Sequence, residues 1–191
     1  QGEGAQSGRA SVFCRFTGCN LWSGREQDRA GALCDFCDTD FIGTDGQNGG
    51  KFADAEALAA RINSFWPDQQ TGKRYVVCTG GEPALQLDTE LIEALHAYGF
   101  EIAIETNGTK PLPPGIDWVC VSPKGRSEVI ITEGDELKLV YPQSEALPER
   151  FAHLAFDHFY LQPLDSPLQN TRTRRCIDYC MAHPQWRLSL Q

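Results

Sequence analysis

Three cysteines near the start of the chain have the spacing of a metal or cluster site. Cys34 and Cys37 form a C-x2-C pair, and Cys19 precedes Cys34 by fourteen intervening residues. A C-x2-C pair lets two thiolates converge on one metal centre. Three thiolates can hold a 4Fe-4S cluster and leave one iron open for a further ligand. Adding Cys14 gives C-x4-C-x14-C-x2-C, which is also compatible with a four-thiolate zinc site.

Further candidate site residues follow short apolar runs that we predict to be strands. The four motifs are Thr79-Gly-Gly-Glu-Pro83, Glu105-Thr-Asn-Gly108, Ser122-Pro-Lys124 and Gln162-Pro-Leu-Asp165. Gly81 allows a close approach of the backbone, Lys124 can pair with a carboxylate, and Asp165 can accept from hydroxyls or an amine. Taken alone, Lys124 is more typical of an exposed lysine in a loop.

Strand-like and helix-like segments alternate along the chain and must position these motifs. The expected strands are residues 11–16, 75–78, 101–105, 118–121, 136–141, 158–162 and 186–190. Helical spacing of apolar residues predicts helices over residues 54–65, 88–98 and 169–183, with Asp88 as an N-cap and Gly99 as a stop. The alternation predicts an α/β fold of mainly parallel strands, a TIM-like barrel or an incomplete part of one.

Residues 17–51 interrupt this alternation and contain the clustered cysteines. The segment is rich in glycine, aspartate and cysteine and has no sustained period. Long loops of this kind are usually functional, and loops at the C-terminal ends of barrel strands build active sites. We expect residues 1–191 to form one domain, with residues 17–51 as an extended cluster-binding insertion.

Composition excludes several classes of function. The 191 residues carry a formal net charge of -9, which argues against a nucleic-acid surface. No apolar run approaches the roughly 20 residues that span a bilayer. Eight cysteines in an acidic chain with no visible signal peptide favour a reducing compartment, so we expect a cytoplasmic protein. Cys78, Cys120, Cys176 and Cys180 lie in apolar strands or on a helix and are expected to be core residues.

The cysteine pattern together with Thr79-Gly-Gly-Glu-Pro83 resembles the radical S-adenosylmethionine superfamily. An aromatic residue, Phe36, precedes the last cysteine as in the cluster loops of that superfamily, although their usual spacing is C-x3-C-x2-C. In the superfamily, the backbone and carboxylate of the GGEP motif hold the methionine amino group of the cofactor. Either motif alone is weak, but their order along the chain makes the resemblance specific.

Several further motifs resemble the 7-carboxy-7-deazaguanine synthase family over essentially the whole chain. These motifs are C-x14-C-x2-C, Gln1-Gly-Glu-Gly4, Phe13-Cys-Arg-Phe16, Cys37-Asp-Thr39, Glu105-Thr-Asn-Gly108 and Ser122-Pro-Lys124. The resemblance implies a radical enzyme that converts 6-carboxy-5,6,7,8-tetrahydropterin to 7-carboxy-7-deazaguanine with release of ammonia, in the biosynthesis of queuosine and other deazapurines. It also implies a 4Fe-4S cluster, S-adenosylmethionine and Mg2+.

Matched position by position, the resemblance assigns roles to individual residues. Cys19, Cys34 and Cys37 would ligate the cluster, and Thr39 would ligate Mg2+ beside Asp38 and Asp40. The S-adenosylmethionine site would comprise Gly81, Ser122, Pro123, Lys124, Gln162, Pro163, Leu164 and Asp165. The substrate site would comprise Gln1, Gly2, Glu3, Arg15, Thr79 and Glu105. No catalytic residue beyond the cluster and cofactor is implied.

The chemistry of these residue types agrees with those roles. Arg15 can pair in a bidentate manner with a pterin carboxylate, and Glu3 and Glu105 can accept from the donors of the pterin ring. Arg15 is equally compatible with a strand residue facing water, and Glu105 with an ordinary charge at a strand end. The resemblance further implies an electron donor such as flavodoxin and a homodimer. The alternatives are another radical enzyme, such as a glycyl-radical activating enzyme, and a zinc-stabilised binding module.

Overall fold

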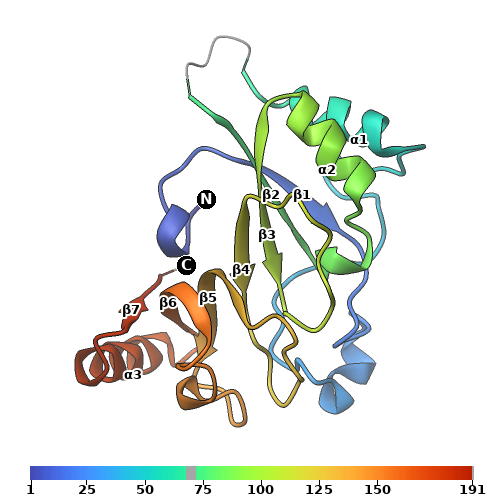
Figure 1. Cartoon of the computed structure of the whole chain (residues 1–191). Coiled ribbons are helices and arrows are strands. Elements are labelled where there is room, and N and C mark those ends of the chain that lie inside the picture. Colours follow the sequence, from blue (N-terminus) through green and yellow to red (C-terminus); the bar gives the residue numbers. More distant parts are fainter. Residues whose placement is uncertain (68–71, 191) are drawn as a thin grey trace. The chain divides into compact units, whose positions relative to one another are not determined.

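The computed structural model of the chain describes residues 1–67 and 72–190 and has an α/β fold (Figure 1). The chain divides into two compact units. Unit 1 comprises residues 1–9, 107–110 and 119–191, and unit 2 comprises residues 10–106 and 111–118.

Unit 2 contains a parallel sheet in the order β1-β2-β3. Its strands are β1 (Val12–Phe16), β2 (Arg74–Gly80) and β3 (Phe100–Thr106). In the register, Cys14 lies opposite Cys78 and Arg15 lies opposite Thr79. Neighbours in register share one face of a sheet, and successive residues alternate between faces. Cys14 and Cys78 therefore share one face, whereas Arg15 and Thr79 share the other.

Two helices of unit 2 lie side by side, α1 (Ala55–Asn63) and α2 (Thr89–Ala97) (Figure 1). Each begins after an aspartate whose side chain accepts a backbone N–H of the first turn. Asp54 accepts from Ala57 at 2.8 Å, and Asp88 accepts from Leu91 at 2.9 Å. These carboxylates satisfy donors that a helix start leaves unpaired. The predicted N-cap at Asp88 is confirmed.

Unit 1 contains parallel strands in the order β4-β5-β6-β7. They are β4 (Trp118–Val121), β5 (Glu133–Tyr141), β6 (Ala155–Pro163) and β7 (Trp186–Leu188), and α3 (Gln169–Ala182) precedes β7. Short 3-10 helices complete the two units: η1 (Gly4–Gln6), η2 (Glu26–Gly31), η3 (Pro83–Leu85) and η4 (Pro148–Arg150).

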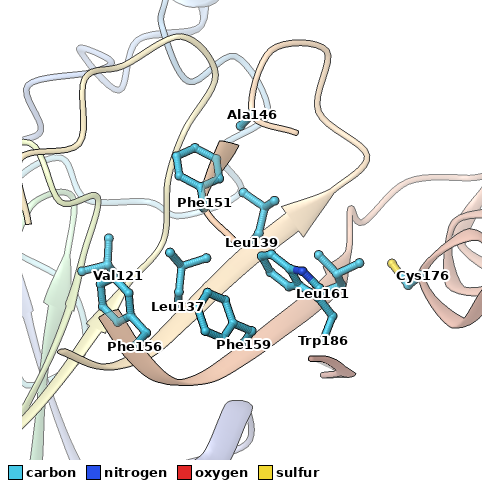
Figure 2. Packing of buried hydrophobic residues seen from close by; sticks show 10 residues of the cluster. All are labelled: Val121, Leu137, Leu139, Ala146, Phe151, Phe156, Phe159, Leu161, Cys176 and Trp186. Atoms are coloured by element: carbon cyan, nitrogen blue, oxygen red, sulfur yellow. The ribbon is translucent and has the colours of Figure 1, made fainter. Parts of the chain in front are cut away.

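The apolar core of unit 1 covers one face of β5 and β6 (Figure 2). Leu137 and Leu139 of β5 pack with Phe159 and Leu161 of β6, and the rings of Phe159 and Trp186 meet edge to face at 5.2 Å. Three alternate positions of the same two strands are polar and also buried: Glu136, Lys138 and Gln162. β5 and β6 thus have one apolar face and a second face that contains buried polar residues.

The predicted fold class and its predicted elements are confirmed. Each predicted strand and helix is present, and the strands are parallel and follow chain order, as in an incomplete TIM-like barrel. The main differences are at β5, which begins at Glu133 instead of residue 136, and at β6, which begins at Ala155 instead of residue 158; backbone pairing between Glu133 and Ala155 extends both strands without apolar side chains. Among the described residues, no helix is both long and apolar enough to cross a membrane.

Candidate functional site

The cysteine-rich segment of residues 17–51 folds around a small aromatic core. It was expected to lack regular structure, yet it contains η2, and Leu21, Trp22 and Phe41 are buried. The rings of Trp22 and Phe41 meet edge to face at 5.6 Å, and the Leu33 N–H donates to the Leu21 carbonyl at 3.1 Å. These contacts give the segment between Cys19 and Cys34 a defined path.

Arg29 fixes the turn that carries the C-x2-C pair. Its Nη1 donates to the carbonyls of Asp35 at 2.9 Å and Cys37 at 3.0 Å. Its guanidinium carbon also lies 4.1 Å from the centre of the Trp22 ring, and its Nε pairs with Glu26. One planar guanidinium can make these contacts together because its donors form a rigid fork. No motif of the sequence singled out Arg29.

The two glycines after Thr79 pack against the beginning of the cysteine segment. A Cβ on Gly81 would lie 2.0 Å from the Gly18 carbonyl oxygen and 3.1 Å from Cβ of Cys19. The Gly81 N–H donates to Phe16 at 3.1 Å, and the Glu82 N–H donates to Gly18 at 2.8 Å. The end of β2 therefore sets the position of the backbone immediately before Cys19, which explains why glycine is needed at position 81.

Glu82 is fully buried and connects the turn after β2 to β3 through a hydrogen bond. Its Oε1 accepts the Thr106 hydroxyl at 2.7 Å and the Ala84 N–H at 3.0 Å. A buried carboxylate requires such donors because an unpaired charge is costly to bury. The contacts assign Glu82 a supporting role in holding the turn between β2 and η3.

The loop cysteines and the strand cysteine Cys14 have different surroundings. Burial raises the pKa of Cys19, and the N–H groups of Leu21 and Trp22 oppose that shift; the Leu21 nitrogen lies 3.5 Å from the sulfur. The charges of Glu82 and Cys37 raise the pKa of Cys19 further. Burial raises the pKa of Cys14 to about 12, which keeps that thiol protonated.

The three loop cysteines are compatible with a three-thiolate cluster. In residues 1–67 and 72–190, no three His, Cys, Asp or Glu side chains are grouped as ligands of one metal ion. Around one tetrahedral zinc, ligand sulfurs at 2.3 Å from the metal would be about 3.8 Å apart. A 4Fe-4S cluster is larger and holds its thiolates farther apart, and N–H donors to sulfur are among the features that tune it. Cys19, Cys34 and Cys37 are therefore compatible with a cluster, and the raised pKa of Cys14 makes that thiol a poorer candidate ligand.

The predicted substrate residues of unit 2 share one face of its sheet. Arg15 lies opposite Thr79, and the register of β2 with β3 places Glu105 next along the same row. A cavity of about 1130 Å³ borders Arg15 and continues past Asp40 to α1. The three loop cysteines do not line this cavity.

Thr39 lies between two aspartates in the cysteine-rich segment. Its hydroxyl donates to Oδ1 of Asp38 at 3.3 Å, whereas Oδ1 of Asp40 accepts the Ile42 N–H at 3.2 Å. Asp40 therefore stabilises a turn, and Asp38 is the carboxylate that contacts Thr39. Oxygen atoms of this kind are the ligands that Mg2+ prefers.

In unit 1, Ser122, Pro123 and Lys124 form a loop after β4 that Gln143 holds in place. The Lys124 ammonium donates to the Ser122 hydroxyl. Gln143, which is buried, accepts the Gly125 N–H at 2.8 Å and donates to the Pro123 carbonyl at 3.3 Å. The loop is thus fixed on both sides of Lys124. Gln143 lies nineteen residues beyond Lys124, so no local motif could have indicated it.

Residues 162–165 include the end of β6, and hydrogen bonds within unit 1 hold this segment in place. The Leu164 N–H donates to the Tyr141 carbonyl at 3.0 Å, and Arg172 of α3 donates to the Leu164 carbonyl at 3.2 Å. Gln162 and Pro163 are buried, whereas Asp165 is exposed. Asp165 is therefore the member of this segment that is most accessible to a ligand.

The segment of Gln1, Gly2 and Glu3 lies against β5. Oε2 of Glu3 pairs with the Lys138 ammonium at 2.8 Å, and the Gly8 N–H donates to the Gln1 carbonyl at 2.9 Å. The sequence did not indicate Lys138 as a site residue, because a lysine inside an apolar strand belongs to no recognisable motif. Within unit 1, the structure brings Glu3 together with Lys138; within unit 2, it brings Arg15 together with Thr79 and Gly81 together with Cys19.

Comparison with known proteins finds relatives over the full length of the chain. A 7-carboxy-7-deazaguanine synthase of Bordetella pertussis is 66% identical over 191 residues, covering 100% of this chain and 90% of that protein. A 7-carboxy-7-deazaguanine synthase of Caulobacter vibrioides is 63% identical over 194 residues, with the same coverage of 100% and 90%. The crystal structure of QueE from Escherichia coli is similar with a TM-score of 0.73 at 31% identity, covering 100% of this chain and 89% of that one. No protein-family model matches the chain.

Proposed function

The chain belongs to the 7-carboxy-7-deazaguanine synthase family, and we propose that it converts 6-carboxy-5,6,7,8-tetrahydropterin to 7-carboxy-7-deazaguanine with release of ammonia. This activity makes it a carbon-nitrogen lyase of queuosine and deazapurine biosynthesis. The observation that carries the proposal is the arrangement at the ends of β1 and β2. There Arg15 lies opposite Thr79 and Gly81 packs against the backbone that leads into Cys19.

The proposed cluster ligands are Cys19, Cys34 and Cys37. Arg29 supports this assignment because it holds the carbonyl of Cys37 and the turn around it, while Gly18 and Gly81 fix the backbone at Cys19. When bound, the 4Fe-4S cluster and S-adenosylmethionine supply the radical chemistry. The protein contributes binding, orientation and exclusion of competing reactions.

The proposed cofactor contacts come from fixed loops. Lys124 offers an ammonium to the carboxylate of S-adenosylmethionine, and Ser122 offers a hydroxyl that Lys124 already contacts. Gly81 offers backbone groups, and Asp165 offers a carboxylate to hydroxyls or an amine. Preformed loops favour binding because less conformational entropy is lost when the ligand arrives.

The proposed substrate contacts are of two kinds. Arg15 pairs with the carboxylate of the pterin, with Thr79 beside it on the same sheet face. Glu3 and Glu105 accept N–H donors of the ring, and Gln1 and Gly2 contribute polar groups of the same segment as Glu3. Thr39 is the proposed protein ligand of Mg2+, with Asp38 acting through water, since Mg2+ usually retains several waters.

The family resemblance supports further proposals about the whole molecule. We propose that residues 1–191 act as a single radical S-adenosylmethionine domain with residues 17–51 as its cluster-binding insertion. We also propose a cytoplasmic homodimer that receives electrons from a donor such as flavodoxin.

An anaerobic assay tests the proposed function. The protein is reconstituted with iron and sulfide, reduced, and given S-adenosylmethionine, Mg2+ and 6-carboxytetrahydropterin, and the products are followed by mass spectrometry. We expect 7-carboxy-7-deazaguanine, and a rate that falls when Mg2+ is removed. Formation of 5'-deoxyadenosine alone would contradict the proposed substrate. A colourless protein with about one zinc per chain would contradict the cluster.

A further inference from the structure

The polar face of β5 contains two charged residues that are almost fully buried. Glu136 is 2% exposed and Lys138 is 5% exposed, while Leu137 and Leu139 between and beyond them point into the apolar core. Strands of parallel sheets are usually apolar on both faces. Buried charges are costly unless they are paired and hydrogen-bonded. These two side chains therefore need partners, and their partners indicate what they do.

Both side chains hold the N-terminal segment that contains Glu3. The Lys138 ammonium lies 2.8 Å from Oε2 of Glu3, and the Glu3 side chain remains 24% exposed. Oε2 of Glu136 accepts the Ala5 N–H at 2.9 Å. The hydroxyl of Ser189, which is also buried, accepts the Gly4 N–H at 3.0 Å. Three consecutive residues of the segment are thus attached to fixed points of unit 1.

Gly4 makes this attachment possible. Its φ is +63°, which favours glycine, and a Cβ at this position would lie 1.9 Å from Oε1 of Glu136. A larger residue would separate the segment from Glu136. The Gln1-Gly-Glu-Gly4 motif therefore combines a carboxylate at position 3 with the glycine that lets the backbone approach β5.

We propose that Lys138 and Glu136 are positioning residues that hold the Glu3 carboxylate in the orientation needed to bind the N–H edge of the pterin. This inference rests on the proposed function. The Lys138 ammonium contacts one carboxylate oxygen, and the exposed part of Glu3 accepts donors of the ligand. Glu136 and Ser189 fix the backbone on the C-terminal side of Glu3. A carboxylate fixed before binding loses less conformational entropy than a mobile one.

The first test compares Lys138→Met, Glu3→Gln and the double variant in the reconstituted enzyme. We expect each single variant to raise KM for 6-carboxytetrahydropterin about tenfold or more, with a smaller change in kcat. If Lys138 acts through Glu3, the double variant is no worse than the more impaired single variant, because residues in one interaction are not additive. Lys138→Arg keeps the cation and should restore KM to within about threefold of the original protein.

The second test measures the segment itself, without turnover. Amide hydrogen exchange of residues 2–8 should be at least about tenfold faster in Lys138→Met and Glu136→Leu, while exchange in α3 is unchanged. Arg174→Met is the matched control, since it breaks an exposed ion pair with Asp178 and should change neither exchange nor KM. If Lys138→Met does not fold, Glu3→Gln provides the same comparison, because Glu3 lies in the segment and its charge is partly solvated.

The outcomes separate this inference from the proposed function. If the original enzyme forms no 7-carboxy-7-deazaguanine, the proposed function fails, and the exchange experiment still reports on the segment. If the original enzyme is active but Lys138→Met and Glu3→Gln retain its KM, or exchange of residues 2–8 is unchanged, the positioning role is wrong. Additive losses in the double variant would also contradict it.

Discussion

Cys14 and Cys19 are five residues apart, yet they lie in different chemical surroundings. Cys14 lies within β1, opposite Cys78, and burial raises its pKa to about 12. Cys19 lies in the loop that follows β1, where the Leu21 and Trp22 N–H groups oppose the effect of burial on its pKa. The backbone donors around Cys14 are used in pairing between strands, whereas those around Cys19 can point at a sulfur.

This difference shows that position in the fold, more than residue type, decides which cysteines can ligate a cluster. A ligand sulfur must be a thiolate, and N–H donors favour the thiolate whereas an apolar surrounding favours the thiol. The same segment also carries Arg29, which holds the turn around Cys37. Cys14 is thus a packing residue of β1, and the loop cysteines are the proposed ligands.

The largest expected effect is the difference in iron content and activity between the Cys34→Ala and Cys14→Ala variants. Removing Cys34 takes away one of three proposed ligands, so iron content after reconstitution should fall to near zero and product formation should be undetectable. Cys14→Ala should retain iron and activity and lose only about 1 kcal/mol of stability, as is usual for a small core change. Iron analysis, visible absorbance and urea unfolding measure these quantities. Loss of the cluster in Cys14→Ala would overturn the distinction between the two kinds of cysteine.

The next largest effect concerns the glycine that supports Cys19. In Gly81→Ala, the new Cβ would lie 2.0 Å from the Gly18 carbonyl oxygen, so the backbone before Cys19 must move. We expect iron content to fall by more than half and activity to fall at least about tenfold, since small displacements of a site can cost that much. Gly46→Ala is the matched control, because no atom lies within 4 Å of the added Cβ. Equal iron content in the two variants would contradict a supporting role for Gly81.

These first two predictions concern residues that the sequence could indicate. The C-x2-C pair and the two glycines are local patterns, and the alternation in Ser11-Val-Phe-Cys-Arg-Phe16 already separates Cys14 from Arg15 by face. Similarly, Asp88 is a helix start that can be predicted because its capping bond is local. Features that depend on a few neighbouring residues are visible before the structure is known.

Replacing Arg29 tests a set of contacts that the sequence could not indicate, namely its hydrogen bonds to the turn that carries Cys37. Arg29→Met removes two hydrogen bonds to the turn that carries Cys37, and bonds of charged donors contribute about 1.5 to 3 kcal/mol. Because 1.4 kcal/mol is a factor of about ten, we expect iron loss to a chelator to be at least about tenfold faster. Arg29→Lys should recover only part of this effect, since an ammonium lacks the guanidinium fork. An unchanged rate of iron loss would mean that the turn needs no such support.

The same limit applies to Gln143, Glu136 and Lys138. Their partners are eighteen or more residues away: Gly125 for Gln143, Ala5 for Glu136 and Glu3 for Lys138. A single buried polar residue within an apolar strand indicates that it has a polar partner, but it does not indicate which residue that partner is. The pairing depends on how the strands are registered, which the sequence alone does not specify. The candidate site residues were therefore predicted from motifs, whereas Gln143, Glu136 and Lys138 were found only in the structure.

The smallest expected effect is a change in how stability depends on pH. Cys14 has a pKa raised from 9.0 to about 12 in the folded protein, so its contribution is fully present below pH 9 and is lost as pH rises toward 12. At pH 10, ionisation of the unfolded thiol lowers the free energy of unfolding of the original protein by about 1.4 kcal/mol. Cys14→Ala lacks this loss, so between pH 8 and pH 10 the stability difference should shift by that amount in favour of the variant, which is enough to cancel a deficit of about 1 kcal/mol. Urea unfolding under reducing conditions measures the deficit, and a deficit that stays constant would show that Cys14 is not held as a thiol by burial.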